Sequence, residues 1–223
     1  MNKVNFLLCT TALTAMVAGA SGHAFAGVIT ETASYGPLTT PYTGQTLNFL
    51  GYTASGGSQT LLSVVVTETD IVNGTVTGAN PTSGPLTLSA GVKNILTLSS
   101  QPANLSLPGV TTFSNTTGKI TVAANSSYTS SNLTGSKSAT STATGSLSDF
   151  LGGWSLTFGE QGHYNGSAQT GINLSAQTTG TVDVSVAYNF ANPAGVPEPM
   201  SAALVGVGLA GMGVVRRRRT AKQ

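Results

Sequence analysis

A segment near the carboxyl end alternates strictly between apolar residues and mostly polar ones. From Thr181 to Phe190, large apolar side chains fall on every second position, at Val182, Val184, Val186, Tyr188 and Phe190. Successive side chains of a strand point to opposite faces of a sheet, so this period of two predicts a strand with one buried and one wet face. Between the two termini no segment shows a sustained helical period, so we expect the core to be built from sheets.

The composition favours the same fold class. Residues Gly27 to Val196 include 53 Ser and Thr residues, and β-branched Thr and Val prefer the pleated, half-buried surface of a strand. Shorter strand-like runs occur at Leu62 to Val66, Leu86 to Leu88 and Ile120 to Val122. We therefore expect an all-β protein, an antiparallel β-sandwich of jelly-roll-like type. A β-solenoid is the alternative fold, but the sequence has no fixed repeat period.

Four glycine-containing pairs mark expected breaks between strands. Asn73-Gly74 and Asn165-Gly166 supply residues that tolerate positive φ, so each predicts a tight hairpin. Gly56-Gly57 and Gly152-Gly153 are expected to be further breaks.

The first residues carry the pattern of a secretory signal peptide. Lys3 begins a short basic region, Phe6 to Ala18 is mostly apolar, and Ala24 and Ala26 are the small residues that a signal peptidase reads. We expect residues 1–26 to be removed, so that the mature protein begins at Gly27. The alternative is an amino-terminal membrane anchor, which the short apolar run disfavours.

Removal of this segment changes what the cysteine and the charges imply. Cys9 is the single cysteine and leaves with the signal, so the mature body has no disulfide and no thiol nucleophile or metal ligand. Between Gly27 and Gly195 the body keeps three lysines against six acidic residues, while the other basic residues lie at the two ends. The basic isoelectric point therefore comes from the termini and does not indicate nucleic-acid binding.

Residues 196–223 combine three features in a fixed order. The motif Val196-Pro197-Glu198-Pro199 is followed by an uncharged run from Met200 to Val215 and then by Arg216, Arg217, Arg218 and Arg219. As a helix the uncharged run spans about 24 Å, which is short of a bilayer's hydrocarbon core of about 30 Å. The arginines are expected to remain cytoplasmic and to hold the body on the other side. A buried helix with a solvated arginine cap is the alternative.

This three-part order resembles the PEP-CTERM sorting signal of Gram-negative bacteria. The resemblance implies recognition by exosortase, an integral membrane processing enzyme that removes the tail and delivers the body to the cell surface or to an extracellular polysaccharide matrix. The segments VITETASYG, LLSVVVTETDIVNGTV and VDVSVAYNF also resemble the choice-of-anchor E domain, which implies a fold and little about mechanism. The expected organisation is a signal peptide at 1–26, a Ser/Thr-rich β-sandwich at 27–195 and the sorting signal at 196–223.

The segment from Ser126 to Ser148 differs from the rest of the body because it has few large apolar residues. It is either a solvated Ser/Thr loop or a pair of strands with polar side chains on both faces. An accessible run of hydroxyls is also a possible site for O-linked sugars.

Few side chains of the body suit catalysis or metal binding. His163 is its single imidazole, and no Gly-x-Ser-x-Gly elbow is present, so we expect His163 to be a surface residue. One histidine without cysteine does not make a zinc site. Glu68 and Asp70 lie two residues apart on one face of a strand, where they either bind Ca²⁺ with backbone carbonyls or keep an outer face soluble. We expect no cofactor and no catalytic residue.

Trp154 lies in the aromatic-rich stretch of the body, together with Phe150, Phe158 and Tyr164. An exposed Trp would provide a platform for a sugar ring, which makes Trp154 a candidate ligand-binding residue. The alternation of Trp154, Leu156 and Phe158 instead predicts that all three anchor the core of the sandwich.

The leading hypothesis is an exported, noncatalytic protein of the cell surface or extracellular matrix, in an exopolysaccharide or biofilm setting. Its partners would be signal peptidase, exosortase and extracellular polysaccharide, and its body would lie in the periplasm while the tail holds it at the inner membrane. A carbohydrate- or ice-binding module is the second hypothesis, which needs a flat outward face of regularly spaced Thr or an exposed Trp. An enzyme acting on polysaccharide is the third, which needs Glu160 to face Asp149 or Asp183.

Overall fold

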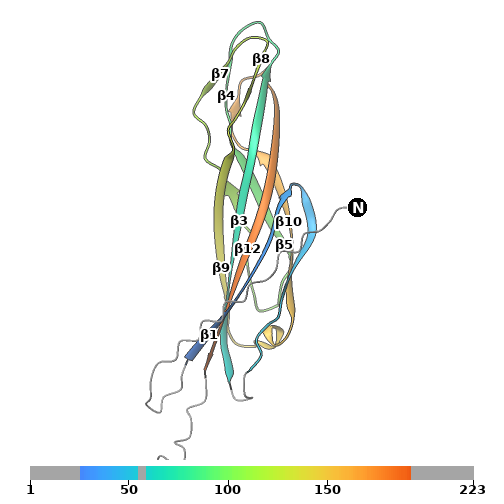
Figure 1. Ribbon diagram of the computed structural model, residues 1–223, viewed down its shortest axis with the longest axis vertical. Coiled ribbons are helices and arrows are strands. Elements are labelled where there is room, and N and C mark those ends of the chain that lie inside the picture. The colour runs from blue at the N-terminus through green and yellow to red at the C-terminus, as the bar shows by residue number, and fades with distance from the viewer. Residues whose placement is uncertain (1–25, 55–58, 192–223) are drawn as a thin grey trace, which may run out of the picture.

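The computed structural model describes residues 26–54 and 59–191 and shows an all-β protein made of antiparallel sheets (Figure 1). The expected signal peptide, the Gly56-Gly57 pair and the whole segment from Val196 to Arg219 lie outside the described residues, apart from Ala26 at the start of the first strand. Among the described residues, no helix has the length and apolar character needed to cross a bilayer.

Two long strands form the centre of the larger sheet. β3 (Thr60–Asn80) pairs along almost its whole length with β12 (Asn173–Ala191), and β1 (Ala26–Thr39) pairs with the other edge of β12. The free edge of β3 is shared by β8 (Ser126–Thr129) and β9 (Leu133–Ala143), which pair with different parts of it.

The second sheet packs across the core from the first. Its order is β2 (Tyr42–Phe49), β10 (Trp154–Tyr164), β5 (Val92–Ser100) and β6 (Thr111–Phe113). A small third sheet of β11 (Ser167–Ala168), β4 (Leu86–Ser89) and β7 (Ile120–Val122) lies at one end of the molecule. A short 3-10 helix, η2 (Ser148–Phe150), precedes β10.

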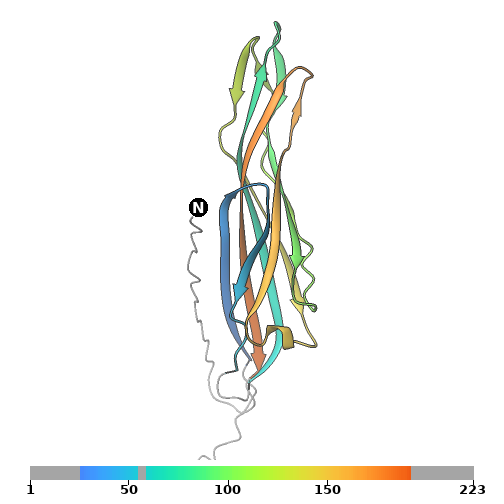
Figure 2. The same ribbon diagram turned by 90° about the vertical axis from the view of Figure 1, so that its right-hand side faces the viewer.

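The molecule is a narrow rod whose length follows β3 and β12, as the two views at right angles show (Figures 1 and 2). β3 has 21 residues and β12 has 19, so both run well beyond the second sheet. The Asn80 end of β3 and the Asn173 end of β12 lie at the end of the rod that carries the small third sheet (Figure 1). The architecture is therefore sandwich-like along most of the rod, as expected from the alternation of the sequence.

The apolar core consists of two separate clusters. The larger cluster joins the two main sheets and contains the inward side chains of β12 that the alternation predicted, from Val182 to Phe190. The smaller cluster lies toward the third sheet and contains Val72, Val76, Leu88 and Val92 among others. The inward residues of β3 that lie between the two clusters are Glu68 and Asp70, which are polar.

The Asn73-Gly74 pair does not form a hairpin, so that prediction is wrong. Both residues lie inside β3, where Asn73 is opposite Thr179 on one side and Thr134 on the other. A Cβ at position 74 would lie 2.4 Å from the carbonyl oxygen of Gln177, so glycine is needed here for close strand approach. Pairing on both edges overrides the local turn preference.

The structure also tests the predictions for the other two glycine-containing pairs and for the Ser/Thr-rich segment. Asn165-Gly166 connects β10 to β11, but β11 pairs with β4, so the turn does not close a hairpin. Gly152-Gly153 lies in the break between η2 and β10, as expected. The segment from Ser126 to Ser148 contributes β8 and β9 to the larger sheet, so the strand interpretation is confirmed and the loop interpretation is wrong.

Candidate functional site

The most unusual feature of the interior is a layer of polar side chains between the two apolar clusters, here called the buried polar layer. Each contributing strand supplies one or two inward positions at this level: Glu68 and Asp70 from β3, Asn94 from β5, Thr112 from β6 and Glu160 from β10. All five side chains are at most 1% exposed. The expectation that Glu68 and Asp70 face solvent is therefore wrong, because they share the inward face of Val64 and Val66.

The Asn94 amide holds two carboxyl groups of this layer together. Its Nδ2 donates one hydrogen bond of 3.0 Å to Asp70 Oδ1 and another of 2.7 Å to Glu160 Oε2. Both N–H groups of the amide are thereby used, and each carboxyl keeps one oxygen directed elsewhere. The amide thus fixes the distance between a carboxyl of the larger sheet and a carboxyl of the second sheet.

Several oxygens of the layer have no hydrogen-bond partner among the described residues. These are Glu68 Oε1 and Oε2, Asp70 Oδ2, Asn94 Oδ1, Thr112 Oγ1, Glu160 Oε1 and the hydroxyl of Tyr42 from β2. The Tyr42 hydroxyl interacts with the Glu160 carboxyl, and the Thr112 hydroxyl interacts with the Asp70 carboxyl, but neither contact has full hydrogen-bond geometry. Unpaired buried oxygens are costly and, in native proteins, require an explanation.

Burial explains the protonation of the layer. Desolvation raises the pKa of Glu68 to about 7, with the neighbouring Asp70 carboxyl adding to the effect. Burial also raises the pKa of Glu160 to about 7, although the Asn94 hydrogen bond opposes the rise. The pKa of Asp70 is raised by burial too, against the Thr112 and Asn94 contacts. Asp70 and Glu160 interact directly, so near neutral pH the pair shares a proton.

A glycine makes room for the layer. Gly180 on β12 lies directly against it, and a Cβ at this position would be 1.4 Å from Glu160 Oε2 and 2.9 Å from Asn94 Nδ2. The backbone of β12 therefore approaches the carboxyl pair as closely as glycine alone permits.

The other acidic and titratable candidates do not join this layer. Asp183 lies on the outer face, where it accepts a hydrogen bond from Ser34, and Asp149 is exposed in η2, so neither faces the buried Glu160. His163 is exposed on β10. Within 26–54 and 59–191, no group of three His, Cys, Asp or Glu side chains has an arrangement that could hold a metal ion.

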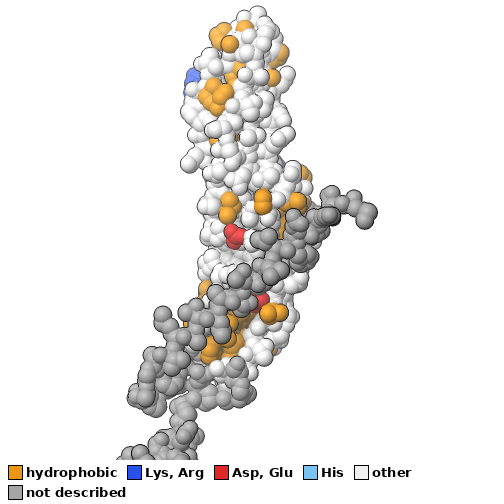
Figure 3. Space-filling view, in the orientation of Figure 1, with side chains coloured by type: hydrophobic (Ala, Val, Ile, Leu, Met, Phe, Trp, Pro, Cys, Tyr) orange, Lys and Arg blue, Asp and Glu red, His pale blue; other side chains and the backbone are white. Residues whose placement is uncertain are grey.

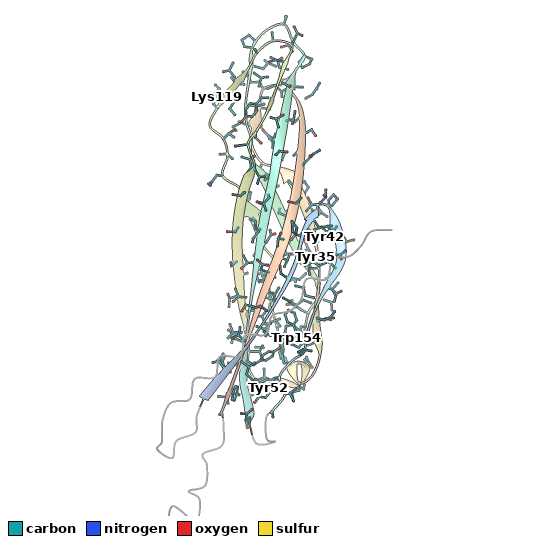
Figure 4. All side chains as sticks on the ribbon, in the orientation of Figure 1. Tyr35, Tyr42, Tyr52, Lys119 and Trp154 are labelled. Atoms are coloured by element: carbon teal, nitrogen blue, oxygen red, sulfur yellow. The ribbon has the colours of Figure 1, made fainter. Side chains whose placement is uncertain are left out.

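Trp154 lies in the core rather than on a surface platform. Its ring stacks on Phe49 with centroids 4.4 Å apart and meets Phe150 edge to face, and its Nε1 donates a 2.8 Å hydrogen bond to the Tyr188 hydroxyl. It is 8% exposed, and Figure 4 shows it between the sheets, toward the end that carries Tyr52. Leu156 and Phe158 share its inward face, as the alternation predicted.

The outer face of the larger sheet carries ordered rows of hydroxyls, and we call it the hydroxyl face. Its members on β3, β9 and β12 include Thr67, Thr69, Ser138, Thr140, Thr179, Thr181 and Ser185. Register places Ser185, Thr67 and Thr140 side by side in one row, and the next row contains Asp183, Thr69 and Ser138. Thr67 and Thr140 hydroxyls are 3.0 Å apart, and Thr69 and Ser138 hydroxyls are 2.8 Å apart.

The surface around the hydroxyl face carries little charge. Four of the acidic residues of the body, Glu31, Glu68, Asp70 and Glu160, are buried. Figure 3 accordingly shows a surface of mostly uncharged polar atoms with few acidic or basic side chains. The described surface of the rod therefore consists mainly of uncharged polar groups such as hydroxyls and amides.

Comparisons with known proteins add no family. No protein-family model matches the chain, and no curated protein matches it. Two similar solved structures are of the infectious bursal disease virus: the Gx strain, at 13% identity and a TM-score of 0.15, and the T13 viral particle, at 12% identity and a TM-score of 0.15. Each match covers 75% of this chain, and 40% and 39% of the viral chains respectively. Likenesses at this level carry no argument.

We expect the free energy of unfolding to fall as the pH rises from about 4.5 to about 7. In that window the folded protein keeps protons on Glu68 and Glu160, whereas the unfolded chain releases them near the ordinary carboxyl pKa of 4.5. The folded state then binds more protons than the unfolded state, so raising the pH favours unfolding by at most about 1.4 kcal/mol per pH unit for each carboxyl.

Urea unfolding between about pH 5 and about pH 8 measures this slope. Glu160→Gln, which removes one of the two protons, should make the slope clearly shallower, whereas Asp149→Asn in exposed η2 should leave it unchanged. An equal slope in the wild type and Glu160→Gln would contradict the assignment of the buried proton.

Gly180→Ala should destabilise the protein by about 3 kcal/mol or more, because the new methyl group displaces the Glu160 carboxyl from Asn94 and breaks a buried network. Gly118→Ala is the matched control, since a Cβ there meets nothing within 4 Å and the change should cost less than about 0.5 kcal/mol. Thermal unfolding of both variants checks the difference. Similar losses for the two would show that Gly180 is not a packing requirement.

Proposed function

We propose that this chain is an exported, noncatalytic protein of the cell surface or extracellular matrix, associated with exopolysaccharide or biofilm. The observation that carries the proposal is a slender, nearly uncharged β-rod with a hydroxyl-rich face, joined in sequence to two terminal targeting patterns. A narrow rod of sheets displays a large surface for its mass, and a surface of hydroxyls and amides suits contact with neutral, hydrated polymers.

The route to the surface is the second part of the proposal. Signal peptidase cuts after Ala26, and Arg216 to Arg219 stay cytoplasmic while an apolar helix in residues 196–223 holds the body in the periplasm. Exosortase then reads Val196-Pro197-Glu198-Pro199 and releases the body to the cell surface. The proposal also includes the jelly-roll-like description of the sandwich and the choice-of-anchor E resemblance of the body.

A carbohydrate- or ice-binding module is the second candidate function, and the hydroxyl face is the observation that favours it. The Thr and Ser hydroxyls there are held in register by strand pairing and by cross-strand hydrogen bonds, so their spacing is set by the sheet. Such a preorganised array loses little side-chain entropy when it binds an ordered layer of hydroxyls or water. A Trp platform does not contribute, because Trp154 is buried.

The export route is tested by replacing Pro197, Glu198 and Pro199 with Ala. If the motif is read by the processing enzyme, full-length protein should accumulate in the inner membrane, and a host lacking the enzyme should show the same pattern with the unaltered protein. Replacing Arg216 to Arg219 with Gln should instead loosen the orientation while leaving the motif intact. Immunoblots of fractionated native cells distinguish these outcomes, and equal surface release of the wild type and the triple-Ala variant would refute the route.

The binding role is tested by Thr67→Lys together with Thr140→Lys, which places two long charged side chains in one row of the hydroxyl face. Binding of the full chain is measured by co-sedimentation with insoluble exopolysaccharide from the native host and by capture on growing ice. Whichever of these two ligands the hydroxyl face binds, the affinity of the double variant for it should be at least about tenfold lower. Thr157→Lys, on the outer face of β10 in the other sheet, is the control and should bind like the wild type. Unchanged binding of both probes by the double variant would exclude the hydroxyl face.

A further inference from the structure

A nucleophile and an amide lie next to each other in the buried polar layer. Asn94 and Thr112 are directly opposite in the pairing of β5 with β6, so their side chains share the inward face, with Cβ atoms about 4.5–5.5 Å apart. Both residues are 0% exposed. A hydroxyl and a carboxamide are therefore held on one inward face, away from bulk solvent.

The groups that would react are the Thr112 hydroxyl and the Asn94 amide. Thr112 Oγ1 and Asn94 Oδ1 have no hydrogen-bond partner, whereas the amide nitrogen is held at 3.0 Å from Asp70 and 2.7 Å from Glu160. The Thr112 hydroxyl contacts the Asp70 carboxyl without full hydrogen-bond geometry, so it lacks the net stabilisation of a complete buried hydrogen bond. Its place beside an amide, rather than in a hydrophobic contact, points to chemistry between the two.

Asp70 is placed to move the proton that such a reaction needs. Its carboxyl interacts with the Thr112 hydroxyl and also accepts the hydrogen bond from Asn94 Nδ2. The same carboxyl therefore lies near both the oxygen that must lose a proton and the nitrogen that must gain one, as a proton shuttle requires. Glu160, on the other side of the amide nitrogen, orients the amide.

We propose that Thr112 and Asn94 form an intramolecular ester bond that joins β5 to β6. Thr112 Oγ1 attacks Asn94 Cγ while Asp70 accepts the hydroxyl proton, and the electron pair of the carbonyl moves to Oδ1. When the carbonyl re-forms, the bond from Cγ to Nδ2 breaks and Asp70 returns its proton to the nitrogen, which leaves as ammonia. The products are one ester and one ammonia, so the step needs no oxidant, cofactor or other reactant.

The surroundings favour this reaction over hydrolysis. Burial keeps water from the ester and from the tetrahedral intermediate. The shared proton of the carboxyl pair leaves one ionised group to act as base near neutral pH. β6 lies at the edge of its sheet and pairs with β5, so the bond would join an edge strand to its neighbour.

The bond would tie the chain covalently without cysteine. The single cysteine, Cys9, lies in the expected signal peptide, so the exported body has no disulfide. An ester between residues 94 and 112 closes a loop, which restricts the unfolded chain in the same way as a disulfide but does not depend on redox conditions.

Mass spectrometry of the full chain recovered from its native host tests the bond directly. Trypsin cuts after Lys93 and Lys119, with no Lys or Arg between them, so Asn94 and Thr112 fall in one peptide, residues 94–119. We expect this peptide to be lighter than its sequence by one ammonia and to give no backbone fragments between residues 94 and 112. Hydroxylamine, which cleaves esters, should restore those fragments.

Matched variants separate the ester from other losses of ammonia. Thr112→Val removes the nucleophile with little change of shape and should abolish the loss, whereas Thr112→Ser should retain it. Thr111→Val, at the adjacent outward position of β6, is the control and should behave like the wild type. Asp70→Asn should slow the loss at least about tenfold if Asp70 shuttles the proton.

Two results would overturn the proposal. A wild-type peptide of the full sequence mass would show that no bond forms. A loss of ammonia that persists in Thr112→Val would assign the loss to ring closure of an Asn with its own backbone.

Discussion

The burial of three carboxyl groups without a cationic partner among the described side chains is the constraint around which the interior is arranged. Glu68, Asp70 and Glu160 lie where both main sheets would otherwise continue their apolar faces. Ionised carboxyls at these positions would carry a large desolvation cost, so protons and the Asn94 amide take the place of a counter-charge. The same layer divides the core into two clusters, and it requires glycine at position 180, where the backbone of β12 meets Glu160.

Alternation alone predicted the fold class and much of the core. Val182 to Phe190 and the set of Trp154, Leu156 and Phe158 are inward as their period of two requires. The same rule also places Glu68 and Asp70 inward, since they continue the positions of Val64 and Val66, and Glu160 continues those of Leu156 and Phe158. The interpretation of Glu68 and Asp70 as residues of a soluble outer face was wrong because it set this alternation aside for acidic side chains. At Leu62 the alternation rule fails. The register between β3 and β12 is irregular between Leu61 and Ser63, and the Leu62 side chain is 51% exposed although it continues the positions of Val64 and Val66.

The candidate site could not be predicted from local sequence patterns, because its residues come together only through the pairing of strands that are far apart in the sequence. Asn94, Thr112 and Glu160 lie on β5, β6 and β10, and nothing in the sequence around any one of them identifies the other two. Asn73-Gly74 failed as a hairpin for a related reason, since β9 and β12 pair with both edges of β3 at this point. Turn propensity is a local preference of a few residues, whereas each edge contributes several backbone hydrogen bonds.

The polar layer and the hydroxyl face are two consequences of one register. Along β3, the outward Thr67 and Thr69 alternate with the inward Glu68 and Asp70. A slip of one residue against β12 would turn the carboxyls to solvent and bury the threonines, separating Asp70 from Asn94. The same slip would expose Val64 and Val66, so apolar burial opposes it as well. The slip would also break the two hydrogen bonds that the Asn94 amide donates, so the partly paired polar layer adds to the discrimination between registers. The ordered hydroxyl rows on the outside then follow from the acids on the inside.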